Sequence, residues 1–343
     1  MKAVVFRSGK KLVFEETPRP ELGSDEVLIK VSDTGFCGSD HSMVEQGEAF
    51  LPDGFILGHE TSGVVADMGA QVTGPKPGDR VIVRPTYCGV CPECLHKGQQ
   101  FCRTNRRALG VMRDLQGAFA EYTKVFPQML IPIPDGVDSR NAAMVEMFAS
   151  SYHGLRVSGK TGGPALVTGG GPIGLALVQL LKIHGFTPVI LSEPVGQKRE
   201  LGRQTGADVV LDPFQEDVVQ YIRDETGGRG LETIFECSGA PGVLQTCVDA
   251  AAVQATVCSI GINWSEVCFK PRDFILKEIH LMGSYSNTHA ENKQVLTWMA
   301  EGRLDGRPLI TDLVTLEELP RVYKERIATG QAVKVLIRIG EEF

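Results

Sequence analysis

The stretch from Pro164 to Met282 alternates short β-rich runs with helical patterns, and this alternation restricts the possible folds more than any other feature. The β-rich runs cover residues 165–167, 189–191, 209–211, 234–237, 256–260 and 279–282. Helical patterns cover residues 173–183, 198–205 and 243–251. Strands that alternate with helices are typical of a doubly wound parallel sheet. The sequence therefore predicts an α/β fold with about six strands in this region.

A glycine-rich turn at residues 169–174 separates the first predicted strand from the first helix. It reads GGGPIG, a G-x-G-x-x-G element whose small residues allow a pyrophosphate to approach the helix N-terminus. Nineteen positions beyond Gly174, Glu193 is placed to accept hydrogen bonds from the two adenosine ribose hydroxyls. These features predict a dinucleotide site. The alternative is a glycine-rich loop that only packs the helix on the strand.

The carboxylate of Glu193 also predicts which dinucleotide binds. A negative charge at this position repels the 2′-phosphate of NADP, so NAD is favoured. Lys198 and Arg199 follow closely and would pair with such a phosphate, which keeps NADP as the alternative.

The remaining sequence has a different pattern. Before residue 148, short strands at 27–31, 63–66 and 80–83 are separated by Gly, Pro and Asp turns, which is an all-β signature. After residue 287, a helical stretch at 292–300 and a strand at 333–339 do not extend the alternation. We therefore predict one domain from residues 1–148 and 287–343 and a second from residues 149–286.

Four cysteines predict a metal-binding lobe at residues 84–104. The spacing of Cys88, Cys91, Cys94 and Cys102 lets one short loop wrap four thiolates around a tetrahedral Zn²⁺. A closed site of this kind leaves no position for a substrate, so its role is structural. A disulfide cluster is the alternative, but it requires an oxidising compartment.

A second group of potential metal ligands lies earlier in the chain. Cys37 is followed 22 residues later by His59 and then by Glu60, each beside a β-type segment. A thiolate, an imidazole and a carboxylate with one open coordination position make a catalytic zinc site. Because a single Cys or His is more often a core or surface residue, this assignment depends on the other motifs.

Charge and composition exclude other classes of function. A net charge of −7 without a basic block argues against a nucleic acid partner. The uncharged stretch 161–181 is as long as a membrane span, but its glycines and prolines divide it, so no membrane segment is predicted. The N-terminal apolar run is too short for a secretory signal and the nine cysteines are an odd number, which favours a reducing cytoplasm.

Together these elements closely resemble the zinc-dependent medium-chain alcohol dehydrogenase family over essentially the whole chain. Its landmarks occur in order at residues 37–40 (CGSD), 58–60 (GHE), 77–81 (PGDRV), 88–102, 117–122 (GAFAEY), 146 (E), 169–174 and 334–335 (KV). The resemblance implies a GroES-like catalytic domain, a Rossmann domain, two zinc ions per chain and NAD(P)-dependent oxidation of a small-molecule alcohol. Family members are dimers or tetramers, so it also implies a homodimer or homotetramer.

The family pattern implies the ligands of the catalytic zinc. Cys37 and His59 would bind it, with Glu60 or Glu146 as the exchangeable carboxylate. Asp40 would accept the free ring N–H of His59, which fixes the tautomer and raises the basicity of that ligand.

The resemblance also implies substrate and cofactor contacts. Ser39 would hydrogen-bond the substrate hydroxyl and start the outward path of its proton. The implied cofactor-binding positions are Gly169, Gly171, Pro172, Ile173, Gly174, Glu193, Lys198, Ile260, Gly261, Ile262, Ser284 and Tyr285.

In having both Glu60 and Glu146, the chain resembles the polyol, butanediol and threonine dehydrogenase branch of the family. This resemblance favours oxidation of a secondary alcohol to a ketone. Three positions depart from the family pattern. Ser42 replaces a histidine of the proton path, and His41 stands one place early, on the opposite face if this segment is a strand. Met147 replaces a usual proline, and residues 285–287 lack the arginine of sorbitol-type enzymes.

Other interpretations stay open. An NADP-linked dehydrogenase of a cyclitol, an amino sugar or a primary alcohol would carry the same motifs. Alkene reductases resemble this family but typically lack the zinc ligands. A nucleotide-sensing or structural zinc protein is the non-enzymatic alternative, and intact Cys37, His59, Glu60 and Ser39 argue against it.

Overall fold

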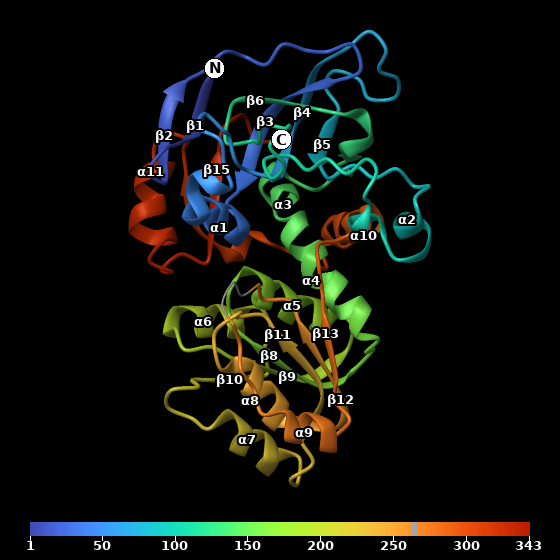
Figure 1. Ribbon diagram of the computed structural model, residues 1–343, viewed down its shortest axis with the longest axis vertical. Coiled ribbons are helices and arrows are strands. Elements are labelled where there is room, and N and C mark those ends of the chain that lie inside the picture. The colour runs from blue at the N-terminus through green and yellow to red at the C-terminus, as the bar shows by residue number, and fades with distance from the viewer. Residues whose placement is uncertain (263–265) are drawn as a thin grey trace. The chain divides into compact units, whose positions relative to one another are not determined.

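The protein divides into two compact units in a computed structural model that describes residues 1–262 and 266–343 (Figure 1). Unit 1 comprises Met1–Glu146 and Thr288–Phe343, and unit 2 comprises Met147–Asn287. The sequence-based boundaries at 148/149 and 286/287 fall beside these divisions. Among the residues described, no helix combines the length and the apolar character needed to cross a membrane.

Unit 2 is built on a parallel sheet with the strand order β10-β9-β8-β11-β12-β13. Its strands are β8 Gly163–Thr168, β9 Phe186–Ser192, β10 Val209–Leu211, β11 Leu231–Glu236, β12 Ala251–Ser259 and β13 His280–Gly283. Its helices are α5 Pro172–Ile183, α6 Gly196–Gln204, α7 Val218–Glu225, α8 Val243–Ala250 and α9 Pro271–Leu276. The predicted doubly wound α/β fold is confirmed.

The central strands of unit 2 are apolar at consecutive positions because they are covered on both faces. In β8, Ala165, Leu166 and Val167 are all fully buried. An antiparallel strand with one wet face would alternate instead. The parallel arrangement also aligns the carboxyl ends of the strands, where ligands bind in such sheets.

Unit 1 is mainly β-structure, with a sheet in the order β14-β15-β3-β4-β5-β7, in which β6 also pairs with β3, and a separate β1-β2 hairpin. Its strands are β1 Lys2–Arg7, β2 Lys11–Glu16, β3 Val27–Gly35, β4 Glu60–Met68, β5 Arg80–Val83, β6 Tyr122–Val125, β7 Leu130–Pro132, β14 Ile310–Val314 and β15 Lys334–Arg338. Its helices are α1 Gly38–Gln46, α2 Pro92–His96, α3 Ser139–Ala143, the first turn of α4 Val145–Ser158, α10 His289–Ala300 and α11 Leu319–Val322.

The register of three neighbouring strands brings distant residues together in unit 1. Strands β3 and β4 are antiparallel and pair Gly35 with Glu60. Strand β15 lies on the other side of β3 and pairs Leu336 with Gly35. The segments just beyond this row therefore meet, although they come from residues near 37, 59 and 334.

The segment after β3 is helix α1, with Cys37 as its N-cap. The carboxylate of Asp40 accepts a hydrogen bond from the backbone N–H of Cys37 at 2.9 Å, which closes a capping box. Residues 41 and 42 are therefore not in a strand, in which they would lie on opposite faces. In a helix, successive side chains are instead about 100° apart.

Candidate active site and metal lobe

Cys37, His59 and Glu146 come together in unit 1. Each offers one potential ligand atom, and these atoms lie within 4.8 Å of one another. Cys37 precedes α1, His59 precedes β4, and Glu146 is in the first turn of α4. The β3–β4 register thus positions two of the three side chains, and a helix from elsewhere in the sequence supplies the third.

Asp40 lies behind the imidazole of His59. Its Oδ1 atom is 3.2 Å from Nδ1 of His59, and the Asp40 side chain is fully buried. Although burial of the ring opposes the change, Asp40 and the thiol of Cys37 raise the pKa of His59 well above its ordinary value. The proton on Nε2 must leave before that nitrogen can bind a metal ion.

The donor set suits zinc. Zinc–nitrogen and zinc–sulfur bonds of about 2.0 to 2.3 Å place ligand atoms roughly 3 to 4 Å apart around the ion. The spacing of the Cys37, His59 and Glu146 atoms is compatible with such a site. Three protein ligands would leave one position open, as catalytic zinc requires.

Glu60 lies outside this group. Its carboxylate is paired with the ammonium group of Lys334, and both side chains are buried. Glu146 is within 3.3 Å of a guanidinium nitrogen of Arg84. The two carboxylates that the sequence left as alternatives therefore have different surroundings. Neither Lys334 nor Arg84 was predicted as a site residue, because Lys334 was only a landmark of the family pattern and Arg84 only the first residue of the predicted lobe.

Ser39 and His41 both belong to α1 but contact different partners. The hydroxyl of Ser39 is 3.4 Å from Nε2 of His59. His41 Nδ1 lies 3.1 Å from the hydroxyl of Tyr323, which donates to Glu45. Ser39 thus lies beside the potential metal ligands, and His41 belongs to a separate polar group.

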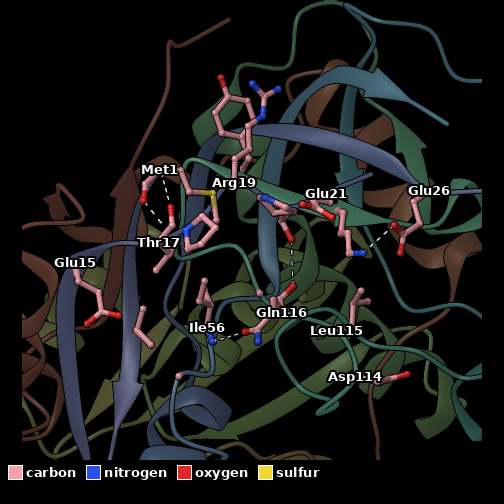
Figure 2. Close-up of a pocket in the computed structure, with 18 of the residues that line it drawn as sticks. Met1, Glu15, Thr17, Arg19, Glu21, Glu26, Ile56, Asp114, Leu115 and Gln116 are labelled. Carbon is pink, nitrogen blue, oxygen red and sulfur yellow. Dashed lines mark hydrogen bonds and ion pairs between the residues drawn. The ribbon is translucent and has the colours of Figure 1, made fainter. Parts of the chain in front are cut away.

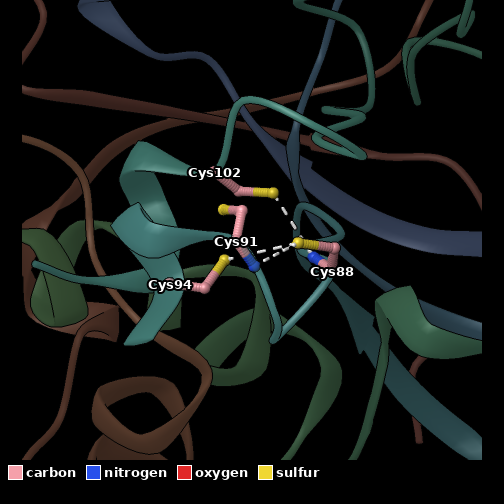
Figure 3. A group of neighbouring side chains, drawn as sticks. All are labelled: Cys88, Cys91, Cys94 and Cys102. Carbon is pink, nitrogen blue, oxygen red and sulfur yellow. Dashed lines mark hydrogen bonds between the residues drawn. The ribbon is translucent and has the colours of Figure 1, made fainter. Parts of the chain in front are cut away.

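The four cysteines of the lobe gather around one point, although they lie on different turns of the chain (Figure 3). Sγ of Cys88 and Sγ of Cys94 are 3.9 Å apart. This matches the roughly 3.8 Å edge expected for a tetrahedron of zinc-bound sulfurs, and all nine cysteines are free thiols.

Backbone donors support a thiolate at Cys102 of the lobe. The backbone N–H of Cys88 donates to Sγ of Cys102 at 3.3 Å, and that of Cys91 donates to Sγ of Cys88 at 3.2 Å. Burial alone would raise the pKa of Cys102, but backbone N–H groups including that of Cys88 lower it to about 6. A thiolate is the form that binds zinc.

The glycine-rich turn of unit 2 forms an anion cradle at the N-terminus of α5. Gly171 is the N-cap of this helix, and a side chain there would meet no atom within 4 Å. A Cβ atom on Gly174 would collide with the carbonyl oxygen of Gly169. Open space over the first backbone N–H groups suits a pyrophosphate, and close packing explains the last glycine.

Glu193 lies beside this cradle and is almost completely buried. Its two carboxylate oxygens accept backbone N–H groups from Gly170 at 2.6 Å and Val195 at 2.7 Å. The guanidinium group of Arg199 donates to the carbonyl oxygens of Glu193 and Pro194 and pairs with Asp212 at 2.9 Å. Each carboxylate oxygen has a second acceptor site, so Glu193 can still bind a ribose hydroxyl.

A further acidic residue organises the other predicted cofactor segments. The backbone N–H groups of Ile260 and Gly261 donate to the carbonyl oxygen of Glu236, at 2.7 and 3.0 Å. The carboxylate of Glu236 accepts hydrogen bonds from the backbone N–H groups of Ser238 and Gly239 and from the hydroxyl of Ser238. Glu236 was not among the residues predicted from the sequence. The signal was available, because it ends a β-rich run at the carboxyl edge of the sheet.

The predicted cofactor positions Ile262, Ser284 and Tyr285 are also in unit 2. The hydroxyl oxygen of Ser284 is buried and has no hydrogen-bond partner within residues 1–262 and 266–343. Ile262 and Tyr285 are exposed. An unpaired buried hydroxyl is costly, so a cofactor amide that hydrogen-bonded Ser284 would satisfy it.

A cavity of about 680 Å³ lies in another part of unit 1, beside the β1–β2 hairpin (Figure 2). Its lining includes Met1, Arg19, Ile56 and Gln116. None of the predicted ligand or cofactor residues lines this cavity, so it is not the candidate active site.

Two family models match the chain in the order of its motifs. Residues 23–135 match the alcohol dehydrogenase GroES-like domain, and residues 172–301 match the zinc-binding dehydrogenase model. The first match contains Cys37, His59 and the cysteine lobe, and the second contains most of the predicted cofactor positions.

Curated relatives and solved structures resemble the chain over nearly its full length. It is 34% identical to sorbitol dehydrogenase of Halalkalibacterium halodurans, with 94% of each chain covered. It is 33% identical to L-threonine 3-dehydrogenase of Pyrococcus horikoshii, which covers 88% of this chain and 87% of the relative. A structure from Sinorhizobium meliloti, described as a zinc-binding dehydrogenase bound to NADP, shares 32% identity and a TM-score of 0.89, with 98% of each chain covered. This chain is therefore an alcohol or polyol dehydrogenase and belongs to the zinc-dependent medium-chain alcohol dehydrogenase family.

Proposed function

We propose that the enzyme oxidises a secondary alcohol to a ketone with NAD⁺, and that the alcohol is a polyol, a vicinal diol, a sugar derivative or a hydroxy amino acid. The main observation in support of this proposal is that Cys37, His59 and Glu146 lie close together, beside Ser39. Relatives that act on sorbitol and on L-threonine support this range of substrates, because both compounds contain a secondary hydroxyl.

Cys37, His59 and Glu146 would hold the catalytic zinc, and Cys88, Cys91, Cys94 and Cys102 would hold a second, structural zinc. When bound, the catalytic zinc lowers the pKa of an alcohol hydroxyl, and the nicotinamide ring accepts the hydride. Ser39 would accept the proton of the substrate hydroxyl in a hydrogen bond. Asp40 would hold His59 in the tautomer that leaves Nε2 free.

Glu146 rather than Glu60 is our assignment for the resting carboxylate ligand. The supporting observation is that Glu146 belongs to the ligand group, whereas Glu60 is paired with Lys334. Exchange of Glu60 onto the metal would break a buried ion pair, which is unfavourable.

NAD is our choice of cofactor, and unit 2 would be the cofactor domain. Glu193 would bind the adenosine ribose and repel a 2′-phosphate. Arg199 already contacts Asp212 and two carbonyl oxygens, which disfavours its use for a phosphate. The NADP-bound relative from S. meliloti favours the alternative, so the two cofactors must be compared directly.

We also infer that the enzyme is a homodimer or homotetramer. Strand β13 pairs with β12 and forms an edge of the sheet in the described part of unit 2. Leu276 and Leu281, on or beside this edge, are exposed. An apolar exposed edge is a ready site for pairing with another strand. Light scattering coupled to size exclusion tests the inference, and a monomer at micromolar concentration contradicts it.

The first experiment is a turnover assay with purified, zinc-analysed enzyme. Sorbitol, vicinal diols, sugar acids, L-threonine and primary alcohols are offered with NAD⁺ and, in parallel, with NADP⁺. A secondary alcohol with NAD⁺ is expected to have the highest kcat/KM. A preference for a primary alcohol or for NADP⁺ contradicts the proposal, and no turnover with two zincs per chain points to a substrate outside this range.

A further inference from the structure

Arg84 is a buried cation at the candidate metal site. It follows the last residue of β5, and its backbone N–H donates to the carbonyl oxygen of Met129 at 2.7 Å. Its side chain is 4% exposed, and Nη2 lies 3.3 Å from Oε1 of Glu146. The strand therefore aims a fixed positive charge at the carboxylate that we assign to the metal.

Glu60 and Glu146 each face a buried cation, but the two pairs are not equivalent. Lys334 pairs with Glu60, which lies outside the ligand group. Arg84 pairs with Glu146, which lies inside it. The ion pair of Lys334 is thus with a carboxylate outside the ligand group. Arg84 instead shares its carboxylate with the metal site.

A carboxylate shared in this way is a weaker ligand. Its two oxygens offer about four lone-pair positions, so it can accept from a guanidinium group and still bind a metal ion. The guanidinium group draws electron density from the oxygens and also repels the cation, because both are positive and separated by only one carboxylate. Burial strengthens both effects, since little water screens them.

We propose that Arg84 is a positioning residue that holds Glu146 and weakens its bond to the catalytic zinc, so that the substrate can replace this ligand readily. The inference rests on the proposed function, in which Glu146 is the resting ligand. It goes beyond that function by naming the residue that makes Glu146 exchangeable.

The test measures zinc release to a chromogenic chelator in the absence of substrate. The C37A variant, which keeps only the lobe site, gives the baseline for the structural zinc. Relative to the parent chain, R84Q is expected to release the catalytic zinc about tenfold more slowly, because the carboxylate of Glu146 is then a stronger ligand. It is also expected to lose about tenfold in kcat, since neighbours of metal ligands alter affinity or activity by about 10- to 100-fold. R84K keeps the charge and is expected to release zinc at the parent rate. R84M also removes the charge and is expected to release zinc as slowly as R84Q. The test therefore does not depend on the folding of R84Q alone.

Two controls locate the effect. Arg80 begins the same strand and pairs with Asp135 at the surface, so R80Q should release zinc at the parent rate. In an E146Q background Arg84 has no carboxylate charge to weaken, so adding R84Q should slow zinc release much less than it does in the parent chain.

Release from R84Q at the parent rate or faster overturns the proposal, because Arg84 would then be neutral or supportive toward the metal. Slow release from R84K overturns the charge argument. If R84Q slows release by the same factor in the E146Q background as in the parent chain, Glu146 is not the mediator. Because no alcohol is present, these outcomes are separate from a failure to find turnover.

Discussion

The ammonium group of Lys334 and the carboxylate of Glu60 form an ion pair that is only 1% and 2% exposed, although the two residues are 274 positions apart. Lys334 also donates to the carbonyl oxygen of Phe36 at 3.3 Å. The backbone N–H of Phe36 in turn donates to Val335. These contacts join the ends of β3, β4 and β15 next to Cys37, so the pair stabilises the framework of the metal site.

Lys334→Met is expected to destabilise the protein by about 3 to 5 kcal/mol, because it leaves the carboxylate of Glu60 buried without its cation. Equilibrium urea unfolding of the variant and the parent chain measures the loss. The double variant K334M/E60Q removes both charges and should recover part of it. A loss below about 1 kcal/mol for the single variant, the value of a surface pair, would contradict a structural role.

Two glycines of the phosphate turn should respond differently to alanine. Gly174→Ala is expected to lower stability by about 1 to 3 kcal/mol, because the new Cβ collides with the carbonyl oxygen of Gly169. Gly171→Ala has open space and an ordinary φ of −74°, so it should keep its melting temperature. It should nevertheless bind the dinucleotide more weakly, since the Cβ occupies the pyrophosphate cradle. Thermal unfolding and cofactor titration separate the two effects, and equal stability of both variants would refute the packing argument.

The burial and contacts of His289 predict how the stability of the protein changes with pH. It begins α10, its Nε2–H donates to the carbonyl oxygen of Pro85 at 2.9 Å, and its ring meets Tyr87 edge-on. Burial lowers the pKa of this imidazole below its ordinary 6.5, although the bond to Pro85 opposes the shift. The unfolded chain therefore binds a proton at a higher pH than the folded chain does. The stability that the buried, neutral imidazole contributes is therefore complete above about pH 6.5 and is lost as the pH falls below that value.

His289→Gln should therefore be less stable than the parent chain at pH 8 and should lose less stability between about pH 6.5 and 5. Melting temperatures of both proteins across this range check the prediction. Parallel curves would show that another group controls the acid response.

The two proposed metal sites should fail in different ways. Cys37→Ala is expected to abolish turnover and leave one zinc per chain, with the fold intact by circular dichroism. Cys91→Ala opens the four-sulfur lobe, so it should mainly lower stability, since structural zinc sites contribute folding energy directly. Metal analysis, thermal unfolding and the turnover assay are run on each variant. A Cys37 variant that keeps its rate would contradict the catalytic zinc assignment.

Features that depend on neighbouring residues could be predicted from the sequence. The strand Arg80–Val83, the turn at 169–174 and the grouping of the four lobe cysteines all follow from local patterns. In each case the relevant atoms are separated by few bonds, so local backbone preferences and spacing determine how they lie.

The surroundings of the candidate active site depended on long-range packing. Glu60 and Glu146 look equivalent as letters. Strand register pairs the carboxylate of Glu60 with the ammonium group of Lys334, and the placement of helix α4 brings Glu146 beside Cys37 and Arg84. The sequence analysis also placed no helix at residues 38–46, where a capping box stabilises α1.

Residue types and their order were thus sufficient to identify the family, the two cofactor classes and the local motifs. The partner of each buried charge was decided by tertiary structure, because electrostatic pairing depends on separation in space and on exclusion of water. In this chain those conditions are met by residues as far apart as Glu60 and Lys334.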